Sequence, residues 1–87
     1  MDTSIKSANG DPLYMVSVAR GMQVLEYIAN SRTGISLREL TEATDLPHAS
    51  IWRAVATLKQ LRLIERQGRN LVLAPRVLSI AWPGVYW

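Results

Sequence analysis

The sequence contains no cysteine, so disulfide scaffolds, thiolate nucleophiles and cysteine metal sites are excluded. A single histidine, His48, leaves no metal site built from several histidines. No run approaches the roughly 18 consecutive apolar residues of a membrane span, and residues 1–10 lack the apolar core of a signal peptide. No residues form a nucleophile–base set. We therefore expect no cofactor, no metal, no membrane partner, no enzymatic activity and a cytoplasmic location.

The charged residues are distributed unevenly along the 87-residue chain, which is 48% hydrophobic and 20% charged, as one small globular domain would be. The formal net charge is +3. Residues 1–47 carry four basic and six acidic groups, whereas residues 48–87 carry six basic groups and one acid, Glu65. A basic half in so small a domain favours a polyanionic partner. The alternative is that these charges only keep the surface soluble.

Apolar spacing predicts a first helix that begins at Ser17 and ends before Asn30. The residues at three- and four-residue intervals, which we expect to be buried, are Val18, Met22, Leu25 and Ile28. Val24 and Tyr27 lie partly outside this stripe. With residues 13–15 they would form a small self-association surface, enough for a weak dimer at best.

Two further helices follow. Ser36 and Glu39 have the spacing of a capping box, which begins a short second helix. Residues 45–47 (Asp-Leu-Pro) interrupt it, and a third helix is predicted over residues 48–61. The residues on its core face are Ile51, Ala54, Val55, Leu58 and Leu61. Its opposite face carries small, polar and basic residues.

The remaining segments predict a hairpin over residues 63–73, with a four-residue connection around Gly68, and a further helix over residues 76–81. We accordingly divide the chain into a flexible N-terminal arm (1–14), a domain (15–75) and a C-terminal tail that begins a linker helix (76–87). The order of elements predicts a mainly α fold of the winged helix-turn-helix type, with three helices and a two-stranded wing.

This fold favours DNA binding, because a helix with one packed and one polar, basic face fits the major groove. The hairpin beside it would reach phosphates or the neighbouring minor groove. Two alternatives remain open: a winged-helix module that binds another protein, which would need no basic wing, and a truncated enzyme.

Five short blocks resemble IclR-type transcriptional regulators, in the same order and with compatible spacing. They are VARGMQVLE (18–26), GISLREL (34–40), LPHASIWR (46–53), TL (57–58) and APRVL (74–78). The resemblance implies a homodimeric repressor or activator whose recognition helix binds a palindromic operator in double-stranded DNA. It also implies a C-terminal domain that binds small organic acids. No such domain follows here, so we expect the chain to be a fragment that meets a small-molecule effector only through that absent domain.

Two positions depart from the pattern of such motifs, which usually have glycine there. Asp45 occupies the turn before the third helix, and Asp tolerates the left-handed conformation of a tight turn. Arg62 follows the third helix, where a left-handed residue other than glycine costs about 1 kcal/mol.

The candidate DNA-binding residues lie on the second and third helices and at the hairpin tip. They are Arg38, His48, Ala49, Ser50, Trp52, Arg53, Thr57 and Arg69. Arg53 can form two hydrogen bonds with guanine or bind phosphate, and Ser50 would either bind phosphate or cap its helix. Trp52 would either pack under a neighbouring helix or cover sugar and thymine methyl groups. Arg69 would either bind phosphate or keep an edge strand soluble.

Overall fold

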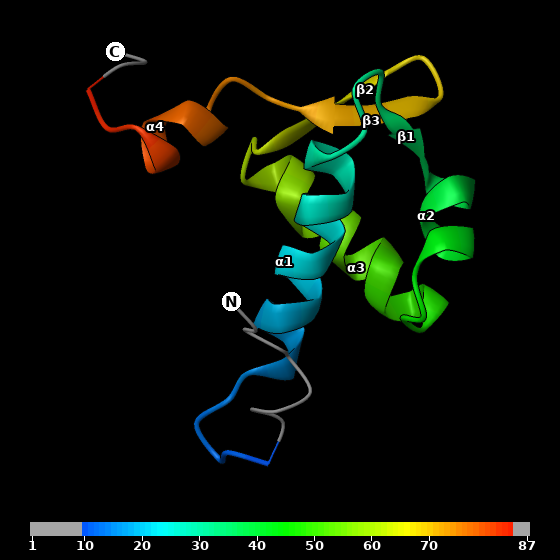
Figure 1. Cartoon of the computed structure of the whole chain (residues 1–87), viewed down its shortest axis with the longest axis vertical. Helices are drawn as coiled ribbons and strands as arrows, with labels where there is room; N and C mark the ends of the chain where they lie inside the picture. Colours follow the sequence, from blue (N-terminus) through cyan, green and yellow to red (C-terminus); the bar gives the residue numbers. More distant parts are fainter. Residues whose placement is uncertain (1–9, 85–87) are drawn as a thin grey trace.

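Four helices and a small antiparallel sheet make up residues 10–84, which the computed structural model describes (Figure 1). The elements are α1 (Val16–Ala29), β1 (Ile35–Ser36), α2 (Leu37–Ala43), α3 (His48–Gln60), β2 (Ile64–Gln67), β3 (Asn70–Leu73) and α4 (Val77–Ala81). The mainly α, winged helix-turn-helix arrangement that the sequence predicts is confirmed. Most of the predicted arm and the last three residues of the tail lie outside the described residues, so the division of the chain stays a prediction.

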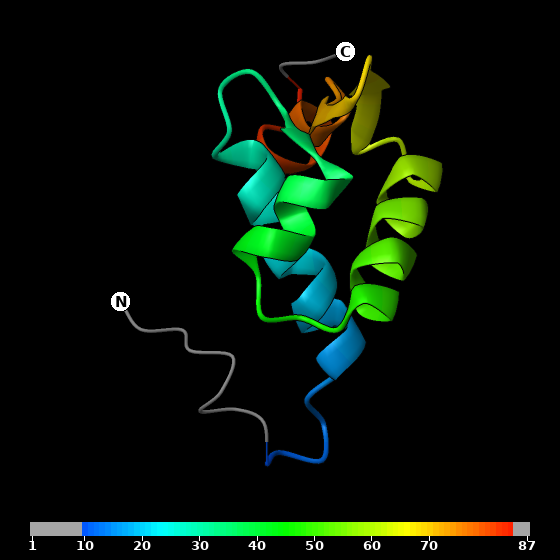
Figure 2. The same ribbon diagram turned by 90° about the vertical axis from the view of Figure 1, so that its right-hand side faces the viewer.

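The core lies where α1, α2 and α3 converge beneath the sheet (Figure 2). Its buried residues come from all three helices and from the hairpin: Val24, Ile28, Leu40, Ile51, Val55, Leu58, Ile64 and Leu71. Helix α3 contributes residues of the predicted core face, with Ile51 fully buried. Leu61, predicted to lie on the same face, is instead 48% exposed, because the helix has ended at Gln60.

The predicted buried stripe of α1 is partly wrong. Val24 and Ile28 are buried, whereas Val18 is 56% and Met22 is 49% exposed. The buried stripe passes, one turn before Val24, through Arg20 and Gly21, which are both half-buried. A pattern that counts only apolar side chains misses this part of the stripe and shifts towards Val18 and Met22.

The capping box at the start of α2 is confirmed. Ser36 Oγ accepts a hydrogen bond from the Glu39 backbone N–H at 3.1 Å, and Glu39 Oε1 accepts one from the Ser36 N–H at 2.9 Å. The turn that follows differs from expectation, because Asp45 does not adopt a positive φ. Arg62 does, with a φ of 61°.

The hairpin is tighter than predicted. Its register runs from Ile64 opposite Leu73 to Gln67 opposite Asn70, so the connection is only the two residues Gly68 and Arg69. Gly68 has a φ of 63°, as the first loop position of a type II′ turn requires.

A third strand, which the sequence did not predict, completes the sheet in the order β1-β3-β2. Ile35 of β1 pairs with Leu71 of β3. The approach is close: a Cβ on Gly34 would lie 2.8 Å from both Asn70 Cβ and Val72 Cγ1, so only glycine fits there without displacement. A strand of two residues is too short for alternation to reveal it.

Candidate nucleic-acid interface

The outer face of α3 is a row of exposed small, polar and basic residues opposite the buried ones. Ala49, Arg53, Ala56 and Gln60 all lie on this side and are exposed. Two alanines leave room for another surface to approach the helix closely, while the Arg53 side chain extends beyond them. Within residues 10–84, Arg53 forms no side-chain hydrogen bond and no ion pair. Its guanidinium donors are therefore available to an external acceptor.

The first turn of α3 also offers donors. Its N-cap is Pro47, which has no side-chain acceptor, so no side chain caps the helix. His48 and Ala49 are exposed in this turn. Their backbone N–H groups lie at the positive end of the helix dipole, where anions bind favourably.

Of the two roles open to Ser50, the helix cap is absent from the structure. Ser50 Oγ accepts a hydrogen bond from Arg20 Nη1 at 3.0 Å. This bond joins α1 to the first turn of α3. The phosphate contact of Ser50 stays a prediction.

Arg20 is the residue that sequence reasoning missed. It lies half-buried beside Ser50 and lines, with Arg53, a groove of about 430 Å³ between α1 and α3. One of its N–H groups is used on Ser50, and a guanidinium has five. The signal was present in the sequence, as a single arginine within the apolar pattern of the first helix.

Trp52 is 62% exposed, so the structure contradicts the first of its two possible roles, packing under a neighbouring helix. It stands on the flank of the same outer face, where it can cover apolar parts of a ligand. Thr57 is also exposed, but its hydroxyl donates to the Arg53 carbonyl oxygen at 2.8 Å. Thr57 therefore retains acceptor capacity and a methyl group for an external contact.

Arg38 on α2 forms an ion pair with Glu42, with 3.3 Å between Nε and Oε2. Both side chains are largely exposed, so this pair contributes little to stability and an external phosphate can replace it. Arg38 lies on α2, whereas Arg53 lies on α3. Arg38 would therefore contact the phosphate backbone of DNA rather than the bases.

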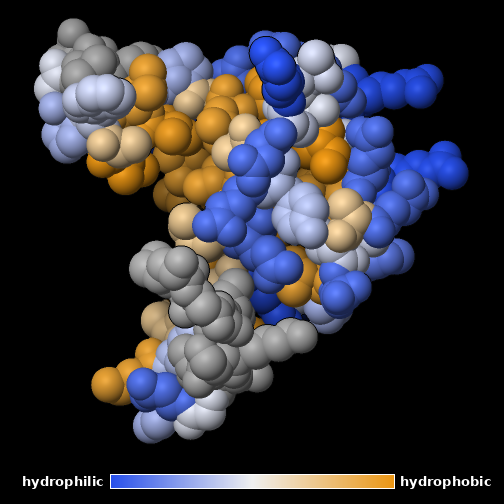
Figure 3. All heavy atoms as spheres, viewed as in Figure 1, coloured by the Kyte–Doolittle hydropathy of each residue, from blue (hydrophilic) through white to orange (hydrophobic). Residues whose placement is uncertain are grey.

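The two arginines of the hairpin differ. Arg66 Nε donates to the Gly68 carbonyl oxygen at 2.9 Å, so its side chain folds back over the loop. Arg69 occupies the second loop position and is exposed. Because Arg66 and Arg69 flank Gly68 in a short connection, the sequence predicts that both side chains project beyond the sheet, and for Arg66 this prediction is wrong. Figure 3 shows long hydrophilic side chains at the right-hand edge, on the side of the hairpin tip and α2, while apolar residues gather between α1 and α4.

Other kinds of site find no support in the part of the chain that the structure describes. Residues 10–84 contain no group of three or more side chains placed to hold a metal ion. None of the helices in this range is both long and apolar enough to cross a membrane.

Comparison with known proteins gives a consistent family. Residues 17–68 match the IclR helix-turn-helix domain, a range that includes every candidate residue except Arg69. The chain is 30% identical over 76 residues to the Pca regulon regulatory protein of Pseudomonas putida, covering 87% of this chain and 26% of that protein. It is 33% identical over 52 residues to the transcriptional repressor IclR of Escherichia coli, covering 60% and 19%.

A solved structure has the same arrangement. The repressor BlcR of Agobacterium tumefaciens superposes with a TM-score of 0.66 at 28% identity, covering 77% of this chain and 27% of that one. The chain thus spans between 19% and 27% of the length of these three proteins.

Proposed function

The chain belongs to the IclR helix-turn-helix family and is a DNA-binding regulatory domain, and we propose that it reads double-stranded DNA with α3 in the major groove. The observation that carries this proposal is the outer face of α3, where Arg53 stands between two alanines and has no side-chain partner among residues 10–84. Arg53 would form two hydrogen bonds with a guanine, a contact that typically discriminates against other bases by about 1–3 kcal/mol.

The surrounding residues would position the helix. Arg20, which lines a groove with Arg53, would bind a backbone phosphate, and so would Arg38 and the first-turn N–H groups of α3. Arg69 would extend these contacts to the next groove from the hairpin. Trp52 and Thr57 would cover sugar and thymine methyl groups, because both present apolar atoms on the same face.

We further infer that two copies bind one palindromic operator, with half-sites one helical turn or a multiple of it apart. The self-association surface expected from the sequence needs revision, because Val24 is fully buried. Val18 and Met22, the most exposed large apolar residues of α1, support a contact between copies instead. A small-molecule effector would act only through a C-terminal domain absent from this chain, and the regulator would work in the cytoplasm.

Binding of the chain to duplex DNA tests the proposal. Bound sequences are first selected from a random duplex pool, and affinities for selected and random duplexes are then measured at several salt concentrations. We expect a preferred sequence with two-fold symmetry and an affinity that falls steeply as salt rises. An interaction module for proteins would show neither, and that result would refute the proposal.

A further inference from the structure

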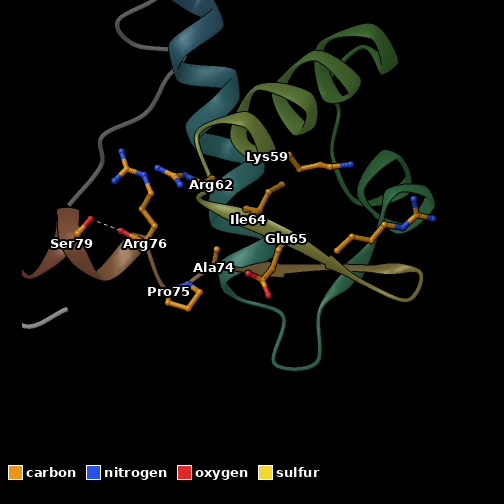
Figure 4. Close-up of a pocket in the computed structure, with 9 residues that line it drawn as sticks. Lys59, Arg62, Ile64, Glu65, Ala74, Pro75, Arg76 and Ser79 are labelled. Atoms are coloured by element: carbon orange, nitrogen blue, oxygen red, sulfur yellow. Dashed lines mark hydrogen bonds between the residues drawn. The ribbon is translucent and has the colours of Figure 1, made fainter. Parts of the chain in front are cut away.

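Several cations gather at the end of α3, and none of them belongs to the interface proposed above. Lys59, Arg62, Arg66 and Arg76 line one cleft of about 630 Å³, in which the only acidic residue is Glu65. Figure 4 shows the Arg62 and Arg76 side chains on the same side of this cleft, whereas Lys59 points away from them.

Arg62 is held in a conformation that arginine disfavours. Among residues 10–84 it is the only residue other than glycine with a positive φ. It follows Leu61, the C-cap of α3, and the Leu63 N–H donates to the Leu58 carbonyl oxygen at 3.0 Å across it. Glycine is the usual residue at this place, because it adopts the left-handed conformation without strain. Strained residues of this kind are concentrated at sites where the side chain serves a function.

Arg76 is fixed beside it. Its Nε donates to the Leu61 carbonyl oxygen at 2.9 Å, and its own carbonyl oxygen accepts a bond from Ser79 Oγ at 2.7 Å. The one ion pair within residues 10–84 joins Arg38 to Glu42, so neither Arg62 nor Arg76 has a carboxylate partner there. Two guanidinium groups that line one cleft, and that have no ion-pair partner within residues 10–84, attract an anion.

The helix dipole explains only part of this arrangement. Cations near a helix C-terminus are stabilising, and Lys59 already occupies the last turn of α3. Such an interaction does not require a second cation in a strained backbone position, because the effect depends on charge and not on the left-handed conformation.

We propose that Arg62 and Arg76 form a phosphate-binding site at the C-terminal end of α3. Two guanidinium groups present several N–H donors to one tetrahedral anion, which is the chemistry that phosphate groups select. The phosphate belongs either to the backbone of a duplex bound along α3 or to free inorganic phosphate. The first source rests on the proposed function; the second does not.

Three substitutions of Arg62 in the 87-residue chain separate charge from backbone strain. Arg62→Lys keeps both the charge and the strain, Arg62→Asn removes the charge and tolerates a positive φ, and Arg62→Gly removes both. Arg32→Ala removes an exposed positive charge from the loop between α1 and β1 and serves as the control.

Thermal unfolding is measured in chloride and in phosphate at equal ionic strength. We expect phosphate to raise the Tm of the wild type and of Arg62→Lys by about 4 °C more than that of Arg62→Asn, because a bound ligand stabilises only the folded state. General stabilisation by excluded phosphate acts on every variant and cancels in this comparison. In chloride, Arg62→Gly should unfold about 2–5 °C above the wild type, because the strain is removed.

Affinity for a random-sequence duplex as a function of salt identifies the source. If the duplex supplies the phosphate, Arg62→Asn reduces the slope of log K against log salt by about 0.9 and Arg62→Lys leaves it unchanged. An unchanged slope with the expected Tm difference assigns the site to free phosphate. Equal slopes together with equal phosphate-induced Tm shifts in the wild type and Arg62→Asn would overturn the proposal. A Tm of Arg62→Gly below that of the wild type in chloride would also overturn it, because Arg62 would then be a structural cap. If no variant binds DNA, the proposed function fails, and the phosphate measurement still decides this site.

Discussion

The thirteen residues of α3 form two faces with different roles, one in folding and one in binding. The inner face buries Ile51, Val55 and Leu58 against the core, while the outer face exposes Ala49, Arg53 and Ala56. Each buried side chain is held by its neighbours, whereas Arg53 has no partner among residues 10–84. Folding therefore depends on one face and binding on the other, and substitutions on the two faces should change different measured quantities.

The largest effect is expected from Ile51→Ala. Ile51 is fully buried where the helices meet, so its truncation removes apolar contacts and leaves a cavity. We expect the free energy of unfolding to fall by about 2–5 kcal/mol, a large share of the stability of so small a domain. Chemical denaturation measures this, with Ile51→Val as the control that should cost only about 0.5–1.5 kcal/mol. A fall of less than about 1 kcal/mol for Ile51→Ala would mean that the inner face does not specify the fold.

Arg53→Ala should reduce operator affinity and leave the stability of the fold nearly unchanged. Its side chain is exposed on the outer face, so the free energy of unfolding should stay within about 0.5 kcal/mol of the wild type. Affinity for the selected operator should fall by about 1–3 kcal/mol. Arg32→Ala removes the same charge from a loop that Figure 2 shows away from α3, and it should reduce operator affinity much less. Unchanged operator affinity in Arg53→Ala would show that this face does not read DNA.

The same contrast explains what the sequence predicts well. Helix α3 has one continuous apolar stripe and one polar face, so the 3.6-residue period identifies both. Ser36 and Glu39 identify the start of α2, because a capping box depends on two residues close in sequence.

The features that the sequence does not predict depend on contacts between segments that are distant in the chain. The predicted buried stripe of α1 includes Val18 and Met22, which are exposed. The error arises because half-buried Arg20 and Gly21 continue the real stripe without adding hydrophobicity. Strand β1 exists only because β3 lies beside it, and the Arg20–Ser50 hydrogen bond joins residues thirty positions apart. The exposure of Trp52 likewise depends on which helices pack beside α3, and periodicity within α3 does not contain that information.

The cap of α2 offers an intermediate effect. Ser36→Ala removes the acceptor of the Glu39 N–H bond but leaves the outer face of α3 unchanged. We expect a loss of about 1 kcal/mol in the free energy of unfolding. At protein concentrations and temperatures where the variant is fully folded, its operator affinity should equal that of the wild type. A variant that loses affinity while folded would show that α2 positions α3 more tightly than the separation of the two faces implies.

The smallest effect is expected from the hairpin. Arg69 lies exposed in a two-residue loop, where a long cationic side chain meets phosphates or a narrow minor groove with little discrimination between bases. Arg69→Ala should weaken binding to operator and random duplex by similar factors and reduce the slope of log K against log salt by about 0.9. Arg66→Ala is the matched comparison, because its Nε is already engaged by the Gly68 carbonyl, and it should change the slope less. A change in base preference at the operator's edges with a constant slope would instead mean that the hairpin reads sequence. If neither property changes, Arg69 only keeps the edge of the sheet soluble, and α3 alone carries the contact with DNA.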